Sequence, residues 1–159
     1  MTNHTATLEA LRSHPFLAGF PQRIVLRLAE LAREVTFESD EVIFREGDGK
    51  DTFYLIVSGA VSIEIHSPGK TLRVQTLREG EELGWSSALP SSRKFFQARA
   101  LRRVRAIAFD GEALRALFEQ DYEIGYRFCR ALLGVAAERI QATQLQLADL
   151  SETAQTLKL

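Results

Sequence analysis

The stretch VIFREGDGKDTFYLIVSGAVSIEI, residues 42–65, decides the fold of this chain. From Val61 to Ile65 apolar residues alternate with polar ones, which is the pattern of a strand that buries one face. Phe53–Ser58 predicts another strand with its odd-numbered residues on one face, and Gly59 predicts a tight connection between the two strands. A turn rich in glycine and acidic residues comes before both.

The same two-residue period continues after this stretch. Ser67–Lys70 predicts a hairpin turn, and Leu72–Thr76 predicts the returning strand. Two more strands are predicted at Phe95–Ala100 and Val104–Phe109, with a turn between them. Many short strands with regularly spaced turn signals indicate a sandwich or barrel. We therefore expect a mainly β fold with flanking helices, in which a jelly-roll β-barrel is followed by a long C-terminal helix.

Helical periodicity lies on both sides of the predicted barrel. An apolar stripe begins at Ile24, and Gly111–Gln120 predicts a helix after the last strand. Asp121 is suited to cap a further helix that runs to about Leu150. The polar residues at both ends of the chain are expected to be loose. The expected parts are an N-terminal segment (1–13), a barrel domain with flanking helices (14–120), a long helix (121–150) and a polar tail (151–159).

The long predicted helix carries a heptad seam, which favours a homodimer. The seam residues fall on two interleaved positions that each repeat every seven residues: Leu133, Ile140 and Leu147, and Ala136, Thr143 and Leu150. The competing interpretation is a helix that packs on its own barrel through Ile124, Phe128 and Leu132. We expect both, with the first half of the helix on the barrel and the second half on a partner.

Composition and charge exclude several classes of protein. The 159 residues suit one domain with an appended helix, and the net charge of -1 argues against general nucleic-acid or anionic-membrane binding. The lone Cys129 suits a reducing compartment, so we expect a cytoplasmic protein. The histidines lack metal-ligand spacing, and no nucleophile–histidine arrangement or P-loop is visible. The sequence therefore predicts neither a metal site nor an enzyme.

A possible anion site lies in GEELGWSSALPSSRKFFQARA, residues 80–100. Leu83–Leu89 predicts a short helix, and the adjacent cations Arg93 and Lys94 follow it. Free backbone N–H groups of a helix and nearby cations that point at one place suit a phosphate. The competing interpretation is a capped helical turn between two strands, with both cations solvated.

From residue 14 to about residue 150 the chain resembles the cyclic nucleotide-binding domain family. The resemblance rests on residues 42–65, on the turn Arg78–Gly80, and on LGWSSALPSSRKFFQARALRRVRAIAF, residues 83–109. This family forms the sensor half of catabolite-activator-type regulators, kinase regulatory subunits and gated channels. The resemblance implies a phosphate-binding cassette at the short helix, and a regulatory function in which the ligand repositions the long helix.

The cassette departs from the family pattern at three of its four usual ligand groups. Gly84 matches, but Trp85 replaces the Glu that accepts from the ribose 2′-hydroxyl, and an indole only donates. Lys94, with Arg93 one place earlier, replaces the phosphate-binding Arg and lacks its bidentate fork. Phe95 replaces a hydroxyl residue. The candidate ligand-binding residues are Gly84, Trp85, Ser86, Ser87, Ala88, Arg93, Lys94 and Phe95.

Two functional hypotheses follow. The first is a non-enzymatic sensor module that binds a cyclic nucleotide or another small anion, although the cassette is poor for ordinary cAMP. The second is a degenerate domain whose pocket is plugged by Trp85 and by Phe95 or Phe96, and which serves as a scaffold for a protein partner. The chain stops at Leu159, so we expect no helix-turn-helix and no direct DNA binding. The net charge and the lack of an apolar run of about 20 residues lead us to expect no membrane contact.

Overall fold

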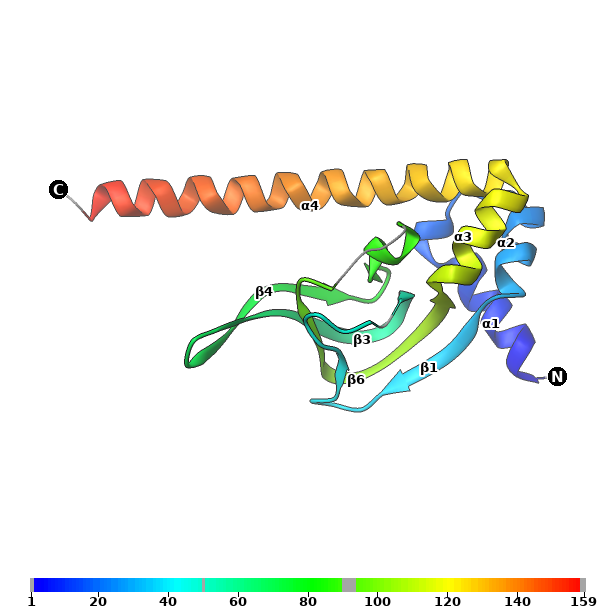
Figure 1. Cartoon of the computed structure of the whole chain (residues 1–159), viewed down its shortest axis with the longest axis horizontal. Coiled ribbons are helices and arrows are strands. Elements are labelled where there is room, and N and C mark those ends of the chain that lie inside the picture. The colour runs from blue at the N-terminus through cyan, green and yellow to red at the C-terminus, as the bar shows by residue number, and fades with distance from the viewer. Residues whose placement is uncertain (1, 50, 90–93, 158–159) are drawn as a thin grey trace.

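An antiparallel sheet occupies the middle of the chain in the computed structural model, which describes residues 2–49, 51–89 and 94–157 (Figure 1). The strands β1, β6, β3 and β4 are neighbours in that order, while β2 pairs with β6 and β5 pairs with β3. The described strands are β1 (Arg33–Phe37), β2 (Val42–Phe44), β3 (Thr52–Ser67), β4 (Lys70–Arg78), β5 (Glu82–Leu83) and β6 (Gln97–Asp110).

The strands β3 and β6 form the centre of the sheet and pair from Thr52 with Asp110 to Glu64 with Gln97. Each is one continuous strand, so the predicted breaks at Gly59 and at residues 101–103 are wrong. The chain keeps its pairing there through register shifts. Gly59 has φ +102°, and a Cβ on it would lie 2.4 Å from the carbonyl oxygen of Arg103. The glycine therefore permits a close approach inside a bulge rather than a turn.

The helices gather at one end of the sheet, and α4 runs across the molecule beyond the β3–β4 hairpin (Figure 1). The 35 residues of α4 give a length of about 52 Å at 1.5 Å per residue. The predicted loose ends are wrong, because α1 begins at Thr2 and α4 continues to Thr156. In the described residues no helix could span a membrane. The helical elements are α1 (Thr2–Ser13), η1 (Pro15–Leu17), α2 (Gln22–Ala29), η2 (Trp85–Ala88), α3 (Gly111–Gln120) and α4 (Tyr122–Thr156).

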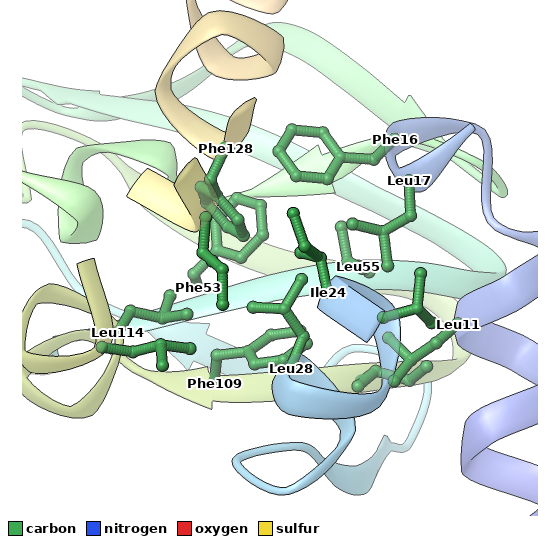
Figure 2. Close-up of a cluster of buried hydrophobic side chains, with 14 of the residues drawn as sticks. Leu11, Phe16, Leu17, Ile24, Leu28, Phe53, Leu55, Phe109, Leu114 and Phe128 are labelled. Carbon is green, nitrogen blue, oxygen red and sulfur yellow. The ribbon is translucent and has the colours of Figure 1, made fainter. Parts of the chain in front are cut away.

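The two faces of β3 bury separate clusters of apolar side chains, which confirms the predicted fold class. Phe53 and Leu55 face the helices and pack with Leu28 of α2 and Phe128 of α4 (Figure 2). The alternate residues Tyr54 and Ile56 lie in the second cluster, inside the barrel, because side chains alternate along a strand. The predicted faces of the strand and of the first helical stripe are both confirmed.

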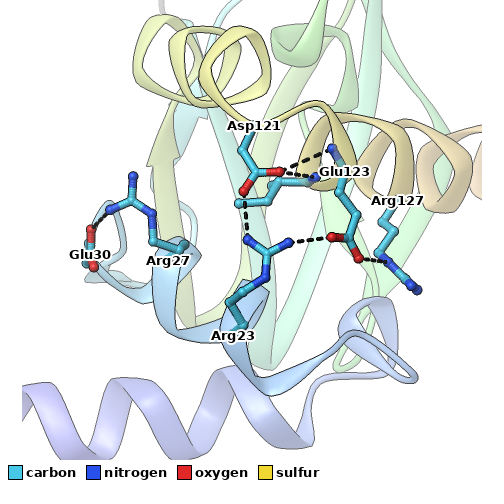
Figure 3. Close-up of polar contacts among 7 residues, drawn as sticks. Arg23, Arg27, Glu30, Asp121, Glu123 and Arg127 are labelled. Atoms are coloured by element: carbon cyan, nitrogen blue, oxygen red, sulfur yellow. Dashed lines mark hydrogen bonds and ion pairs between the residues drawn. The ribbon is translucent and has the colours of Figure 1, made fainter.

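Polar contacts join α2 to the start of α4 (Figure 3). Asp121 caps α4 as predicted, since its carboxylate accepts from the backbone N–H groups of Glu123 and Ile124. Arg23 of α2 then donates to the carboxylate oxygens of Asp121 at 2.7 Å and Glu123 at 2.5 Å. Because Arg23 is half exposed, these ion pairs contribute little to the free energy of unfolding. Their main effect is to orient α2 relative to the start of α4.

His14 gives the fold a pH dependence. It is 4% exposed, its Nδ1 accepts from the N–H of Phe16, and its Nε2 lies 3.1 Å from the carbonyl oxygen of Ile56. Burial lowers the pKa of His14 from its usual 6.5, against the opposing effect of backbone carbonyls. The unfolded chain then binds more protons than the fold, so stability must fall with falling pH.

We expect the free energy of unfolding to decrease between about pH 7 and pH 5 as the unfolded state protonates His14. His14→Gln keeps one donor but does not titrate, so its urea-unfolding curves should lose that part of the pH dependence. An unchanged dependence in this variant would assign the effect to other groups.

Candidate ligand-binding cassette

The predicted cassette is built on a short turn between β5 and η2. Gly84 has φ +77°, and a Cβ there would lie 2.5 Å from the carbonyl oxygen of Thr52, so the position requires glycine. The helical piece is shorter than predicted, because Leu83 belongs to β5 and η2 covers only Trp85–Ala88. Ser87 and Ala88 are buried in it, whereas Ser86 is half-buried.

Lys94 is the buried cation of the cassette. The residue is 6% exposed, and its Nζ donates to Ser87 Oγ at 2.8 Å. The same Nζ lies 5.1 Å from the ring centroid of Phe44, inside the barrel. Burial lowers the pKa of Lys94, and the nearby charge of Asp51 opposes this shift. Arg93, the other predicted cation, lies outside the described residues.

A second layer of contacts holds η2 against α3. Arg115 Nη1 donates to the carbonyl oxygen of Ser87 at 2.7 Å, and Arg115 Nη2 lies 2.8 Å from Asp51 Oδ2. The backbone carbonyl of Asp51 accepts from the N–H of Gly111, the first residue of α3. Sequence reasoning missed Arg115 and Asp51, because no local signal places a helix arginine or a residue before a strand beside the cassette.

The aromatic side chains of the cassette do not fill its interior. Trp85 is 37% exposed, Phe95 is 73% exposed and Phe96 is 42% exposed. These exposures speak against the alternative in which Trp85 and Phe95 or Phe96 plug the pocket. The reason is local, since β6 begins only at Gln97, so Phe95 and Phe96 precede the sheet and its regular alternation of faces.

A polar groove of about 490 Å³ lies beside the cassette and is lined by Arg45, Glu46, Gly47, His66 and Gln97. Gln97 is buried and donates through Nε2 to Glu64 Oε2 at 2.9 Å. Its neighbour Ala98 belongs to the cluster inside the barrel, so Gln97 faces the other side of the sheet. This groove and the Lys94 site are thus separate places where an anion could be tested.

The predicted seam lies on the outer part of α4. The apolar seam residues Leu133, Ile140, Leu147 and Leu150 are exposed, Thr143 is exposed and Ala136 is half-buried. The predicted packing of the first half is confirmed, because Ile124, Phe128 and Leu132 are buried against the barrel and the other helices.

Comparisons with known proteins agree with the fold described above. The family described as cyclic nucleotide-binding domain matches residues 34–121. A CRP-like cAMP-activated global transcriptional regulator of Mycobacterium tuberculosis is 28% identical over 143 residues. That match covers 89% of this chain and 62% of the relative, so the chain spans less than two thirds of the relative's length.

Two solved structures share the fold at low sequence identity. A cyclic nucleotide-binding domain from Methylobacillus flagellatus KT has a TM-score of 0.77 and 18% identity, over 91% of this chain and 82% of that one. The regulatory subunit of a cAMP-independent protein kinase A from Trypanosoma brucei has a TM-score of 0.71 and 20% identity, over 89% of this chain and 50% of that one.

Proposed function

Because the chain belongs to the cyclic nucleotide-binding domain family, we propose that it is a non-enzymatic regulatory sensor with an atypical phosphate-binding cassette. Its ligand is a cyclic nucleotide or another small anion, and it signals through α4. The exposed seam of α4 supports a homodimer, and the proposal includes a protein partner in the cytoplasm.

The buried ammonium of Lys94 is the observation that carries the ligand proposal. Its hydrogen-bond partner is the neutral hydroxyl of Ser87, and its aromatic neighbour is Phe44. Burial of a cation without a direct counter-charge is costly, and an anion beside Nζ would repay part of that cost. Lys94 also stands where the family's phosphate-binding Arg is expected.

The rest of the cassette supports an unusual ligand selectivity. Trp85 has no acceptor for a ribose hydroxyl, and its side chain is partly exposed beside the turn. A lysine neutralises a phosphate without the bidentate geometry of arginine. We therefore expect ordinary cAMP to bind weakly, and we assign the recognition to the phosphate charge.

The single tryptophan makes the ligand proposal directly testable, because Trp85 lies in the cassette. We expect a saturable change in Trp85 fluorescence, with a matching heat in calorimetry, when the protein is titrated with cAMP, cGMP and a cyclic dinucleotide. The matched control is Arg45→Met in the separate polar groove, which should leave the affinity unchanged. A response that Arg45→Met removes would place the ligand in the groove instead.

The dimer proposal predicts a monomer when the seam carries a charge. Leu147→Asp should shift the mass in sedimentation at micromolar concentration from dimer to monomer, because it places an unpaired carboxylate in an apolar interface. Leu145→Asp is the matched control, since Leu145 is exposed on the same helix but outside the seam. A monomeric wild-type protein would remove the dimer proposal.

A protein-interaction scaffold is the second candidate function. It is favoured by the exposed apolar side chains of the cassette, Trp85, Leu89, Phe95 and Phe96. Under this alternative none of the three nucleotides gives a heat or a fluorescence change, while the dimer through α4 remains.

A further inference from the structure

The outer half of α4 has few contacts with its own barrel. Its buried residues all lie in the first third of the helix, at Ile124, Gly125, Phe128 and Leu132. From residue 133 onward the described residues are exposed or half-buried, although α4 passes over the region of η2 and β4 (Figure 1). Val135 still packs against the core cluster, so beyond it the direction of α4 depends mainly on polar contacts with the barrel.

An ion pair between Arg139 and Glu82 is such a contact. Arg139 Nη2 donates to Glu82 Oε1 at 2.7 Å and to the backbone carbonyl oxygen of Glu82 at 2.6 Å. The side chains are only 20% and 8% exposed, respectively. A pair this well shielded is strongly sensitive to the loss of either partner, because the remaining charge would be left buried.

The acceptor of this pair belongs to the cassette. Glu82 is in β5, two residues before Gly84, and it is the first residue of the short strand that leads into the turn. Lys94 Nζ lies 3.4 Å from the position that a Cβ of residue 84 would occupy. The ammonium of Lys94 therefore lies beside the turn at Gly84, and Glu82 is only two residues from that turn.

We propose that the Glu82–Arg139 pair sets the direction of the outer half of α4 and couples it to the cassette, which makes Arg139 a positioning residue for the seam. This inference rests on the proposed sensor function. The cassette biases the pair between formed and broken, and the seam residues Ile140 and Leu147, which follow Arg139 on the same helix, are presented differently in the two states.

Hydrogen exchange measured by mass spectrometry tests the positioning role without any ligand. We expect Arg139→Gln and Glu82→Gln to raise exchange about tenfold or more in β5 and in residues 133–150 together. Arg127→Gln is the matched control, because Arg127 pairs with Glu123 on α4 itself rather than with the barrel. Equal exchange in Arg139→Gln and Arg127→Gln would overturn the inference.

Addition of cAMP or cGMP tests the coupling. In the wild-type protein we expect the nucleotide to change exchange in residues 133–150, and in Arg139→Gln we expect this change to be lost while Trp85 fluorescence still responds. A change that persists in Arg139→Gln would overturn the coupling. A wild-type protein that gives no fluorescence or exchange response would overturn the sensor function and the coupling, while the ligand-free exchange would still decide the positioning role.

Discussion

Replacement of Phe128 by alanine is expected to lower the free energy of unfolding by about 3–5 kcal/mol, the largest loss that we expect from a single side chain. Phe128 is fully buried and lies 5.0 Å from Phe16, 5.2 Å from Phe53 and 5.1 Å from Phe118 between ring centroids. It joins the base of α4 to η1, β3 and α3 at once. Its loss leaves a cavity that three other elements border, so local collapse cannot fill it.

Thermal unfolding gives the measurement. Each kcal/mol shifts the melting temperature by about 2–4 °C in a chain of this size. Tyr126→Ala is the matched control, because Tyr126 is an exposed aromatic residue two positions earlier on the same helix. Nearly equal melting temperatures for the two variants would mean that α4 is not held to the barrel by this cluster.

The parts of the fold that sequence reasoning predicted depend on local periodicity. The alternation at Phe53 and Leu55, and the helical spacing of Ile124, Phe128 and Leu132, give the buried faces directly, because burial of one face imposes that period. Asp121 was predicted as a cap for the same kind of reason, since its carboxylate needs only N–H groups two and three residues away.

The break that was wrongly predicted at Gly59 arises because a glycine suits two different backbone structures. A glycine between two apolar runs is compatible with a turn, which ends pairing, and with a bulge, which continues it. At Gly59 the choice depends on Arg103, whose carbonyl oxygen approaches from a strand more than 40 residues away. The residues near Gly59 therefore do not indicate whether the strand ends there or continues through a bulge.

In the candidate cassette, too, local sequence indicated some residues, whereas other contacts depend on packing between distant parts of the chain. Lys94 was one of two adjacent candidate cations in the predicted cassette. Its neutral partner Ser87 and the contact of Ser87 with Arg115 depend on how η2 packs against α3. The alternative in which Trp85 plugs the pocket could not be decided from the sequence, because apolar character does not say on which side of a short turn a side chain lies. The pair between Glu82 and Arg139 joins residues 57 positions apart and has no local signal at all.

Replacement of Lys94 by methionine is expected to remove most of the ligand affinity and to leave the fold intact. A hydrogen bond to a charged group contributes about 1.5–3 kcal/mol, so the dissociation constant for a phosphate ligand should rise about ten- to a hundredfold. Methionine has similar length and no charge. The relief of burying the ammonium should offset the lost bond to Ser87, so the free energy of unfolding should change by no more than about 1 kcal/mol.

Calorimetry with cAMP, cGMP and a cyclic dinucleotide, together with urea unfolding, measures both effects in one set of samples. Lys94→Arg is the conservative control, because it keeps the charge and supplies the fork that phosphate recognition prefers. If Lys94→Met bound a nucleotide as tightly as the wild-type protein, then the buried ammonium would serve only the packing of Phe44 and Ser87. If it unfolded the protein, the cation would be needed for the fold itself. Retained stability with lost affinity would instead mean that this domain keeps a buried charge for its ligand, as an internal cation with no direct counter-charge should.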